Sequence, residues 1–239
     1  DVDFIETYGA SEGFFSFQDD LEDPSMLLHL DNGVFYEFVR VDEKDQENPP
    51  RHTIADVEPG VRYSLYVTSS SGLWAYEVGD VIRFTNTFPH KITVAGRTSE
   101  MIDEYGEALY GDEARAALRH ACDQTGTHVV DYHIAPRAMS GDGGRPGHEW
   151  VIEFEEPPGD LDAFSGLIDE YLQGVNRHYQ MRREARAFDA PTISAVPDGT
   201  FYAWLKATKD SISGQTKVPR MSDSRTVADG ILETVNYTN

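Results

Sequence analysis

Residues 8–12 read Tyr-Gly-Ala-Ser-Glu and combine an aromatic ring, two small residues, a hydroxyl and a carboxylate. The Tyr8 ring can stack on a planar base, and the small pair that begins at Gly9 lets the backbone approach it. The Ser11 hydroxyl and the Glu12 carboxylate can meet a phosphate or its magnesium ion. A strand end followed by a turn explains the same residues, so both interpretations stay open.

Two further segments carry groups of the same kind between β-rich stretches. In YEVGD, residues 76–80, the Gly-Asp pair is typical of a tight turn, and the Asp80 carboxylate could also accept two hydroxyls of a ribose. TSSSG, residues 68–72, is not a phosphate-binding P-loop, because it joins two predicted strands and has no lysine.

Two of the basic residues of the chain lie in segments where they could have a functional role. Lys217, one of five lysines, lies in SGQTKVPR, residues 213–220, where it is either a solvated charge or a cation that stabilises a developing phosphoryl or acyl oxyanion. Arg97 lies in GRTSEMIDEYGE, residues 96–107, at a change of composition that is typical of a linker or a hinge.

Other chemistries find no support in the sequence. The eight histidines show no zinc-ligand spacing, and a single cysteine excludes an internal disulfide. No Ser-His-Asp set can be named, because Ser11 is not in a nucleophile-elbow motif. Cys122 lies on the apolar side of a predicted helix, which predicts a buried thiol.

The charge balance is unusual: 42 acidic against 20 basic residues give a net charge of −22. Such a field repels nucleic acid and anionic membranes. The acids are spread along the chain, which favours adaptation to high salt over an acidic surface for a basic partner. A melting temperature that does not rise between low and molar salt would contradict this hypothesis. No apolar run reaches the roughly 18 residues of a membrane span. The first residues, DVDFIETY, do not have the pattern of a signal peptide, so we expect a cytoplasmic protein.

The first part of the chain is predicted to be mostly β. Residues 26–41 read as two strands joined at Asn32-Gly33, a hairpin signal. Residues 62–84 predict two more strands around a turn at residues 70–72, and another strand is expected near residues 91–95.

After residue 97 the pattern changes to alternating strands and helices. A helix is expected over residues 112–122, with Asp112 as its N-cap and Gly126 just beyond its end. Further predicted elements are strands at THVVDYHIA and HEWVIEFE, a mobile connection at residues 140–147, one helix over residues 160–183, strands near 192–196 and 200–207, and a last helix over 224–235.

The order of these motifs is more specific than any of them alone. YGASE, YEVGD, GR-x(4)-I-x(3)-G and a late lysine in QTKVPR resemble the acyl-adenylate-forming superfamily, in which the third motif follows GRxDDxIKxxG. Gly96, Arg97, Ile102 and Gly106 are in register with it. YGASEGFF, the block from Tyr63 to Phe84 and QTKVPR are similar to the auxin-responsive acyl-acid amido synthetases and their bacterial relatives, which join a carboxylic acid to an amino acid through acyl-AMP.

The resemblance implies an α+β fold in two parts: residues 1–96 as the β-rich, barrel-like tail of a large adenylation domain, and residues 97–239 as a smaller, mobile C-terminal domain. It implies ATP and Mg²⁺ as cofactors and places the family's phosphate loop upstream, so the chain is expected to be a C-terminal fragment that is inactive alone.

The resemblance also implies residue roles. Tyr8 and Gly9 would lie at the adenine, Ser11 and Glu12 would face the α-phosphate and Mg²⁺, and Asp80 would hold the ribose hydroxyls. Arg97 would mark the nucleotide side of the hinge, and Lys217 would stabilise the charge of adenylation.

Two departures from the pattern leave the hinge chemistry open: Ser99 replaces a carboxylate and Asp103 replaces a lysine. Two other functions also stay open, an acyl-CoA ligase of the same superfamily and a nonenzymatic acidic interaction module. The acid, the acceptor amine and the oligomeric state are not specified.

Overall fold

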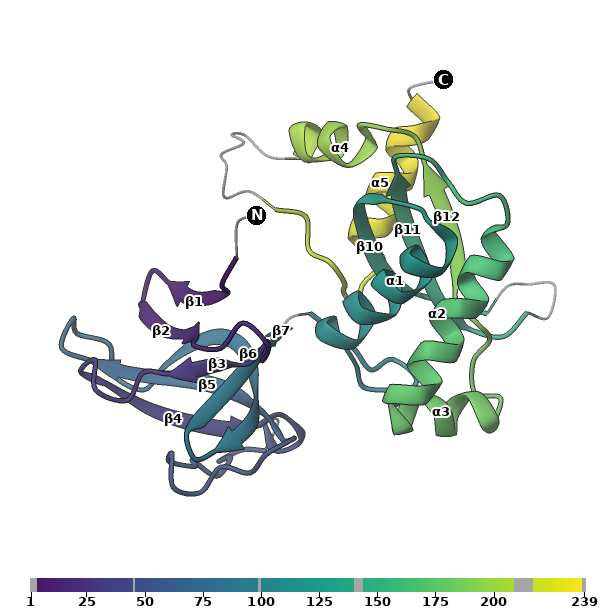
Figure 1. Cartoon of the computed structure of the whole chain (residues 1–239). Coiled ribbons are helices and arrows are strands. Elements are labelled where there is room, and N and C mark those ends of the chain that lie inside the picture. Colours follow the sequence, from purple (N-terminus) through teal and green to yellow (C-terminus); the bar gives the residue numbers. More distant parts are fainter. Residues whose placement is uncertain (1–3, 45, 99, 140–143, 209–216, 238–239) are drawn as a thin grey trace. The chain divides into compact units, whose positions relative to one another are not determined.

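The computed structural model describes the chain except residues 1–3, 45, 99, 140–143, 209–216 and 238–239. The chain divides into two compact units, Asp1–Ser99 (unit 1) and Glu100–Asn239 (unit 2) (Figure 1). Each unit has its own apolar core. In the described residues no helix has the length and apolar character needed to cross a membrane.

Unit 1 is a seven-stranded antiparallel sheet in the order β1-β2-β3-β7-β6-β5-β4. Its strands are β1 (Thr7–Ala10), β2 (Gly13–Gln18), β3 (Met26–Leu28), β4 (Val34–Arg40), β5 (Arg62–Ser69), β6 (Tyr76–Thr87) and β7 (His90–Arg97), with a short 3₁₀ helix at Val41–Glu43. The predicted strands at residues 62–84 and 91–95 are confirmed.

The sheet of unit 1 curls around an aromatic core. Phe15 on β2 contacts Tyr36 on the far edge strand β4, with ring centroids 6.2 Å apart. Phe38 and Phe84 pack edge to face at 5.2 Å. Because strands from both ends of the sheet meet through these rings, unit 1 has the barrel-like form that was predicted.

The two strands predicted within residues 26–41 are present as β3 and β4, but the prediction that they form a hairpin is wrong. β3 pairs with β2 and β7, whereas β4 pairs with β5. The Asn32 side chain donates to the Phe14 carbonyl (2.8 Å) and to the Tyr36 hydroxyl (3.3 Å). Asn32 therefore links β2 to β4 instead of closing a two-residue turn between paired strands.

Unit 2 is a three-layer α+β arrangement around the sheet β10-β11-β12. Its elements are the β8 (Met101–Ile102) and β9 (Leu109–Tyr110) ribbon, α1 (Gly111–Thr125), β10 (Val129–Arg137), β11 (Gly147–Phe154), α2 (Leu161–Val175), α3 (Arg177–Glu184), β12 (Thr192–Val196), α4 (Thr200–Thr208) and α5 (Thr226–Tyr237).

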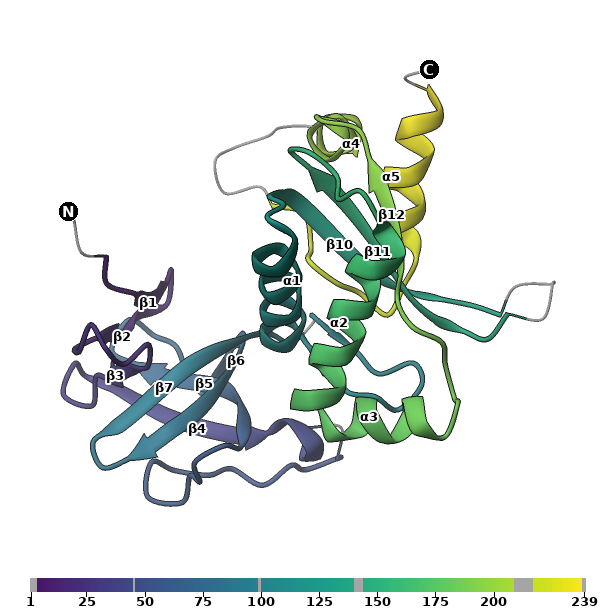
Figure 2. The ribbon, with the colours of Figure 1, turned by 45° about the vertical axis from the view of Figure 1, so that its right-hand side comes forward.

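The two faces of the unit 2 sheet are covered by different helices (Figure 2). Trp150 and Ile152 of β11 belong to the core with α1, α2 and α3, whereas the intervening Val151 packs with α4 and α5. β11 runs antiparallel to β10 and parallel to β12. The period of two along β11 thus divides its side chains between two cores.

The single helix predicted over residues 160–183 is interrupted, and that prediction is wrong. Asn176 has extended backbone angles, φ −116° and ψ 106°, between α2 and α3. Its side-chain oxygen accepts from Tyr179 N, and its amide donates to the Ala108 carbonyl and to Glu113. The Asn176 side chain thus caps α3 and joins it to Ala108 and Glu113, contacts that the apolar stripe does not reveal.

The strand predicted over residues 200–207 is also wrong, because Thr200–Thr208 forms α4. The buried Glu153 carboxylate on β11 accepts from Gly199 N and Phe201 N at 2.9 and 3.0 Å. A carboxylate at a helix N-terminus satisfies amides that have no partner within the helix and complements its dipole.

Smaller predictions have mixed outcomes. Gly126 ends α1 in the left-handed conformation as expected, but the N-cap is Tyr110, and Asp112 lies in the first turn. Cys122 is only partly buried, so the prediction of a buried thiol is wrong. The predicted strand 192–196 and the last helix are confirmed. The predicted mobile connection includes residues 140–143, which lie outside the described residues.

Candidate functional site

In unit 1 the structure brings together four of the residues that the sequence singles out. The Tyr8 hydroxyl on β1 donates to Asp80 Oδ2 on β6 at 2.7 Å. Arg97 on β7 is the register partner of Asp80, and its Nε lies 3.5 Å from Asp80 Oδ1. The Glu12 carboxylate acts electrostatically on both Asp80 and Tyr8. We call Tyr8, Glu12, Asp80 and Arg97 the unit 1 polar group.

Asp80 is a buried carboxylate at the centre of this group, with 8% of its surface exposed. Burial raises its pKa above the ordinary value, while the Tyr8 hydrogen bond and the Arg97 charge lower it and Glu12 raises it further. Burial and the carboxylate of Asp80 in turn raise the pKa of Tyr8. The hydroxyl of Tyr8 is thus a permanent donor that favours the ionised form of Asp80.

The turn predicted for YEVGD is not present, since residues 76–80 lie inside β6. Gly79 has φ +86°, a conformation that strains any other residue, and its carbonyl accepts from Thr98 N. The irregular backbone beside Asp80 therefore depends on glycine at position 79. In the TSSSG segment, Thr68 and Ser69 end β5, and the turn predicted at residues 70–72 follows them.

Ser11 and Glu12 form the turn between β1 and β2. The Ser11 hydroxyl donates to Glu12 Oε2 at 2.8 Å. Glu12 also lines a hollow of about 490 Å³ together with Asn32 and residues 69–71. Its carboxylate is therefore available to a ligand, unlike that of Asp80, which is held by two protein groups.

The residues of the unit 1 polar group suit a magnesium nucleotide only in part. No cluster of three His, Cys, Asp or Glu side chains suited to a metal occurs in the described residues. Mg²⁺ needs no such cage, because it binds through one or two carboxylates together with substrate phosphates and water. Glu12 meets that requirement, but the Tyr8 ring is 7% exposed and packs on Phe15 at 5.2 Å.

Lys217 belongs to unit 2 and is exposed at the start of a segment fixed to β10. Ile134 N donates to the Arg220 carbonyl, and Ser222 N donates to the Ile134 carbonyl. The side chains of Val218 and Met221 are 5% and 1% exposed. The residues that follow Lys217 are therefore rigidly held, whereas Lys217 itself faces solvent.

His133 adds a side-chain contact to the same segment. Its Nδ1 lies 2.6 Å from the Pro219 carbonyl, which can only accept, so Nδ1 carries the proton. Burial lowers the pKa of His133, and Arg225 lowers it further, against the opposing effect of the Pro219 bond. No sequence motif marks His133, since only the fold places it beside Pro219.

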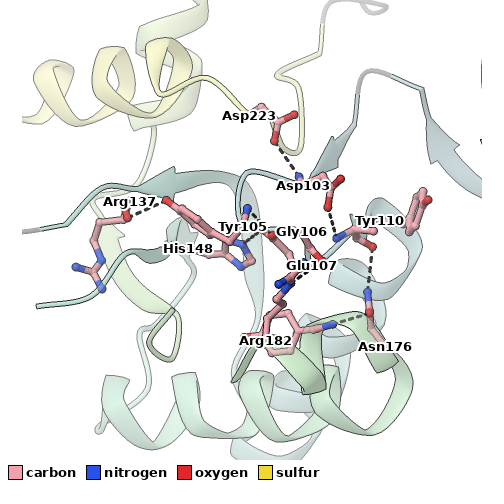
Figure 3. A network of polar contacts seen from close by, with 12 residues as sticks. Asp103, Tyr105, Gly106, Glu107, Tyr110, Arg137, His148, Asn176, Arg182 and Asp223 are labelled. Carbon is pink, nitrogen blue, oxygen red and sulfur yellow. Dashed lines mark hydrogen bonds and ion pairs between the residues drawn. The ribbon is translucent and has the colours of Figure 1, made fainter. Parts of the chain in front are cut away.

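The segment after Arg97 is anchored in unit 2 by a buried polar network (Figure 3). His148 Nε2 and Glu107 Oε1 are 2.6 Å apart, and both side chains are fully buried. Glu107 Oε2 also accepts from Tyr105 N. Asp103, at the position where the superfamily pattern has lysine, accepts from Ala108 N, and its own amide donates to Asp223. Ser99 lies outside the described residues.

Gly106, the last glycine of the motif, is favoured by its left-handed backbone conformation, and a side chain there would also displace the flexible end of Arg182. It has φ +76°, and a Cβ there would lie 2.5 Å from Arg182 Nη2. The Arg182 Nε donates to the Gly106 carbonyl at 3.3 Å. The motif residues from Ile102 to Glu107 therefore stabilise unit 2 itself, a role that the spacing of the motif does not reveal.

Residues 27–97 match the GH3 family central domain, and residues 112–226 match the GH3 family C-terminal domain. The chain belongs to the GH3 family.

Similar proteins agree with this assignment. The chain is 26% identical to the indole-3-acetic acid-amido synthetase GH3.3 of Arabidopsis thaliana over 89% of this chain and 38% of that protein. It is 28% identical to the jasmonoyl–L-amino acid synthetase JAR4 of Nicotiana attenuata over 83% of this chain and 35% of that protein. The chain thus spans less than two fifths of the length of these relatives.

The solved structure of the GH3.15 acyl acid amido synthetase has the same fold. It superposes with a TM-score of 0.71 at 21% identity, covering 96% of this chain and 42% of that one. The α+β class with a β-rich first part is therefore confirmed.

Proposed function

We propose that this chain is the C-terminal part of an ATP-dependent ligase that activates a carboxylic acid as acyl-AMP and transfers the acyl group to an amino acid amine. The proposal rests on one observation: Tyr8, Asp80 and Arg97, from three strands, meet through a hydrogen bond and an ion pair. The names of the relatives, which are amido synthetases, support the same reaction class.

In this proposal Asp80 accepts the two ribose hydroxyls, for which it must be ionised. The Tyr8 hydroxyl and the Arg97 guanidinium favour that state against the effect of burial. Gly9 lies at the adenine with Tyr8, and Ser11 and Glu12 lie at the phosphate side, where Glu12 would bind Mg²⁺ together with the nucleotide. Bound Mg²⁺ supplies charge neutralisation at the reacting phosphate.

The role proposed for Lys217 is electrostatic. Acid attack on the α-phosphate builds negative charge, and a preorganised ammonium stabilises it. Lys217 is exposed on a rigid segment, as such a role requires. We further propose that residues 1–96 are the end of a large adenylation domain and that residues 97–239 move as one domain, which would admit the amine after adenylation.

The proposal is tested in the full-length polypeptide by acid-dependent exchange of pyrophosphate into ATP. Lys217→Ala should lower the exchange rate by about a hundredfold or more and leave ATP binding nearly unchanged. Lys206→Ala, at another exposed lysine of unit 2, is the control. An unchanged exchange rate in Lys217→Ala would remove this lysine from the mechanism.

Asp80→Asn tests the nucleotide site independently. It should weaken ATP binding about tenfold or more, because the bonds from the ribose to a charged acceptor are lost. Asp31→Asn, at an exposed carboxylate of unit 1, should have no effect. Wild-type ATP affinity in Asp80→Asn, or no ATP binding by the wild type, would favour a nonenzymatic module.

The product distinguishes an amido synthetase from an acyl-CoA ligase. An amide that forms only when an amino acid is present supports the proposal, whereas a thioester that forms only with coenzyme A contradicts it. A cytoplasmic location is part of the proposal, and fractionation of the source cells would test it.

A further inference from the structure

Unit 2 carries a pocket with an unusual charge for this acidic chain. It has a volume of about 260 Å³ and lies between α1 and β10, with the α1–β10 connection and the segment after Lys217 completing its wall. Three arginines and one histidine are among its ten lining residues, and none of the ten is Asp or Glu: the four are Arg115, Arg119, His128 and Arg220. We call it the arginine pocket.

Two of these arginines have no carboxylate partner within the described residues. Arg115 and Arg119 are four residues apart on α1, so they lie on the same side of the helix. Neither makes an ion pair in the part of the chain that the structure describes, although the chain has twice as many acids as bases. A second hollow of about 370 Å³ shares both arginines but is also lined by Asp112 and Asp123. The arginine pocket is therefore the side on which an anion would be attracted.

Arg220 brings a third cation from a different part of the chain. Its guanidinium lies 4.9 Å from the centre of the Tyr132 ring and forms an ion pair with Asp131, which does not line the pocket. Burial and the neighbouring Arg115 charge lower the pKa of Arg220, although Glu100 opposes this effect. Two guanidinium groups that repel one another at a partly buried site favour the binding of an anion between them.

The remaining wall of the pocket is mostly apolar. Leu118, Cys122 and Val129 line it, and the Tyr132 ring continues the same surface. A pocket of this size is smaller than those for drug-sized ligands, which begin at about 300 Å³. The pocket therefore suits a small ligand that has an anionic oxygen head group and an apolar body about the size of one ring.

We propose that the arginine pocket binds a small organic anion through Arg115, Arg119 and Arg220, with the apolar body of the ligand against Leu118 and Tyr132. This site lies wholly within unit 2 and does not involve the unit 1 polar group or Lys217. It is therefore separate from the proposed adenylation chemistry.

The test uses the 239-residue chain and three probes: phenyl phosphate, benzoate and inorganic phosphate. Binding is measured by calorimetry at low salt and by the NMR signals of the arginine Nε–H groups. Phenyl phosphate or benzoate should bind more tightly than inorganic phosphate and should shift the signals of Arg115 and Arg119. Phenyl phosphate as the tighter ligand would identify a phosphate head group, and benzoate a carboxylate.

The double variant Arg115→Gln/Arg119→Gln should weaken binding by about tenfold or more, since each lost bond is charge-assisted. The control Arg177→Gln/Arg186→Gln removes the same charge at exposed positions of unit 2 and should bind like the wild type. The proposal is overturned if no probe binds at about 10 mM, a concentration well above a millimolar Kd. It is equally overturned if the two double variants weaken binding equally, because only net charge would then matter.

Discussion

The hydrogen bond between Tyr8 and Asp80 is expected to be the strongest polar contact between β1 and the rest of unit 1. The Tyr8→Phe substitution deletes only the hydroxyl and keeps the ring on Phe15. Asp80 then keeps one protein cation, Arg97, at 3.5 Å, whose side chain is 68% exposed and therefore well screened. Within the described residues no other side chain replaces the lost donor to this buried carboxylate.

The expected cost follows from the state of the acceptor. A hydrogen bond to a charged group contributes about 1.5–3 kcal/mol, whereas a neutral one contributes about 0.5–1.5 kcal/mol. Tyr36→Phe is the matched control, because Tyr36 is a similarly buried residue, 4% exposed against 7% for Tyr8, and its hydroxyl accepts from the neutral Asn32 amide at 3.3 Å. Tyr8→Phe should therefore destabilise unit 1 by about 1 kcal/mol more than Tyr36→Phe.

The assay must report unit 1 alone, since two units need not unfold together. Amide hydrogen exchange at the central strands β5 and β6 gives the opening free energy of that unit. In a double-mutant cycle with Asp80→Asn, the coupling free energy should be about 1–2 kcal/mol. A Tyr8→Phe cost that persists in full in the Asp80→Asn background would refute the argument, as would a cost no larger than that of Tyr36→Phe.

Two predictions concern unit 2. Because the pKa of His133 is lowered in the folded state, the neutral form is favoured there, and stability is fully present above the ordinary pKa of about 6.5 and declines as the pH falls below it. His133→Gln should flatten the fall in melting temperature between about pH 6.5 and pH 5, and an unchanged slope would contradict this. Glu107→Ala leaves His148 without its buried partner and should cost about 3–5 kcal/mol in urea unfolding. Glu170→Ala, at an exposed position of α2, should cost less than about 0.5 kcal/mol, and equal losses would refute the role of the pair.

The sequence predicts the local elements better than their partners. The strands at residues 62–84 pair as expected, because a short turn leaves them no other arrangement. The predicted pairing of the two strands within residues 26–41 was wrong, because an Asn-Gly pair indicates only that the chain changes direction. The polar contacts of Asn32 to Phe14 and Tyr36 decide what the chain does next, and they exist only in the curled sheet.

Contacts between residues that are distant in the sequence also explain the wrong predictions in unit 2. The apolar stripe continues through Asn176, but its amide finds better partners in Ala108 and Glu113, which are more than 60 residues away. Residues 200–207 have the aromatic composition of a strand, yet Glu153 caps them as a helix. In the candidate site the residue types were recognisable, whereas the donation from Tyr8 to Asp80 required the register of three strands.

The anchoring of the segment that follows Lys217 can be tested at a residue that carries no charge. Met221 is 1% exposed and forms the bridge to Ile134 that fixes this segment on β10. A displacement of about 1 Å in a catalytic group can cost about a hundredfold in rate. In the full-length polypeptide, Met221→Ala should therefore lower the rate of adenylation severalfold or more without weakening ATP binding, although it removes no charge. Met181→Ala, at a methionine of α3 that is 53% exposed, should leave both unchanged. If Met221→Ala retains the wild-type rate while the segment loosens, as seen by faster amide exchange at Ile134 and Ser222, then Lys217 does not need this anchor, and a rigid catalytic lysine is the wrong description.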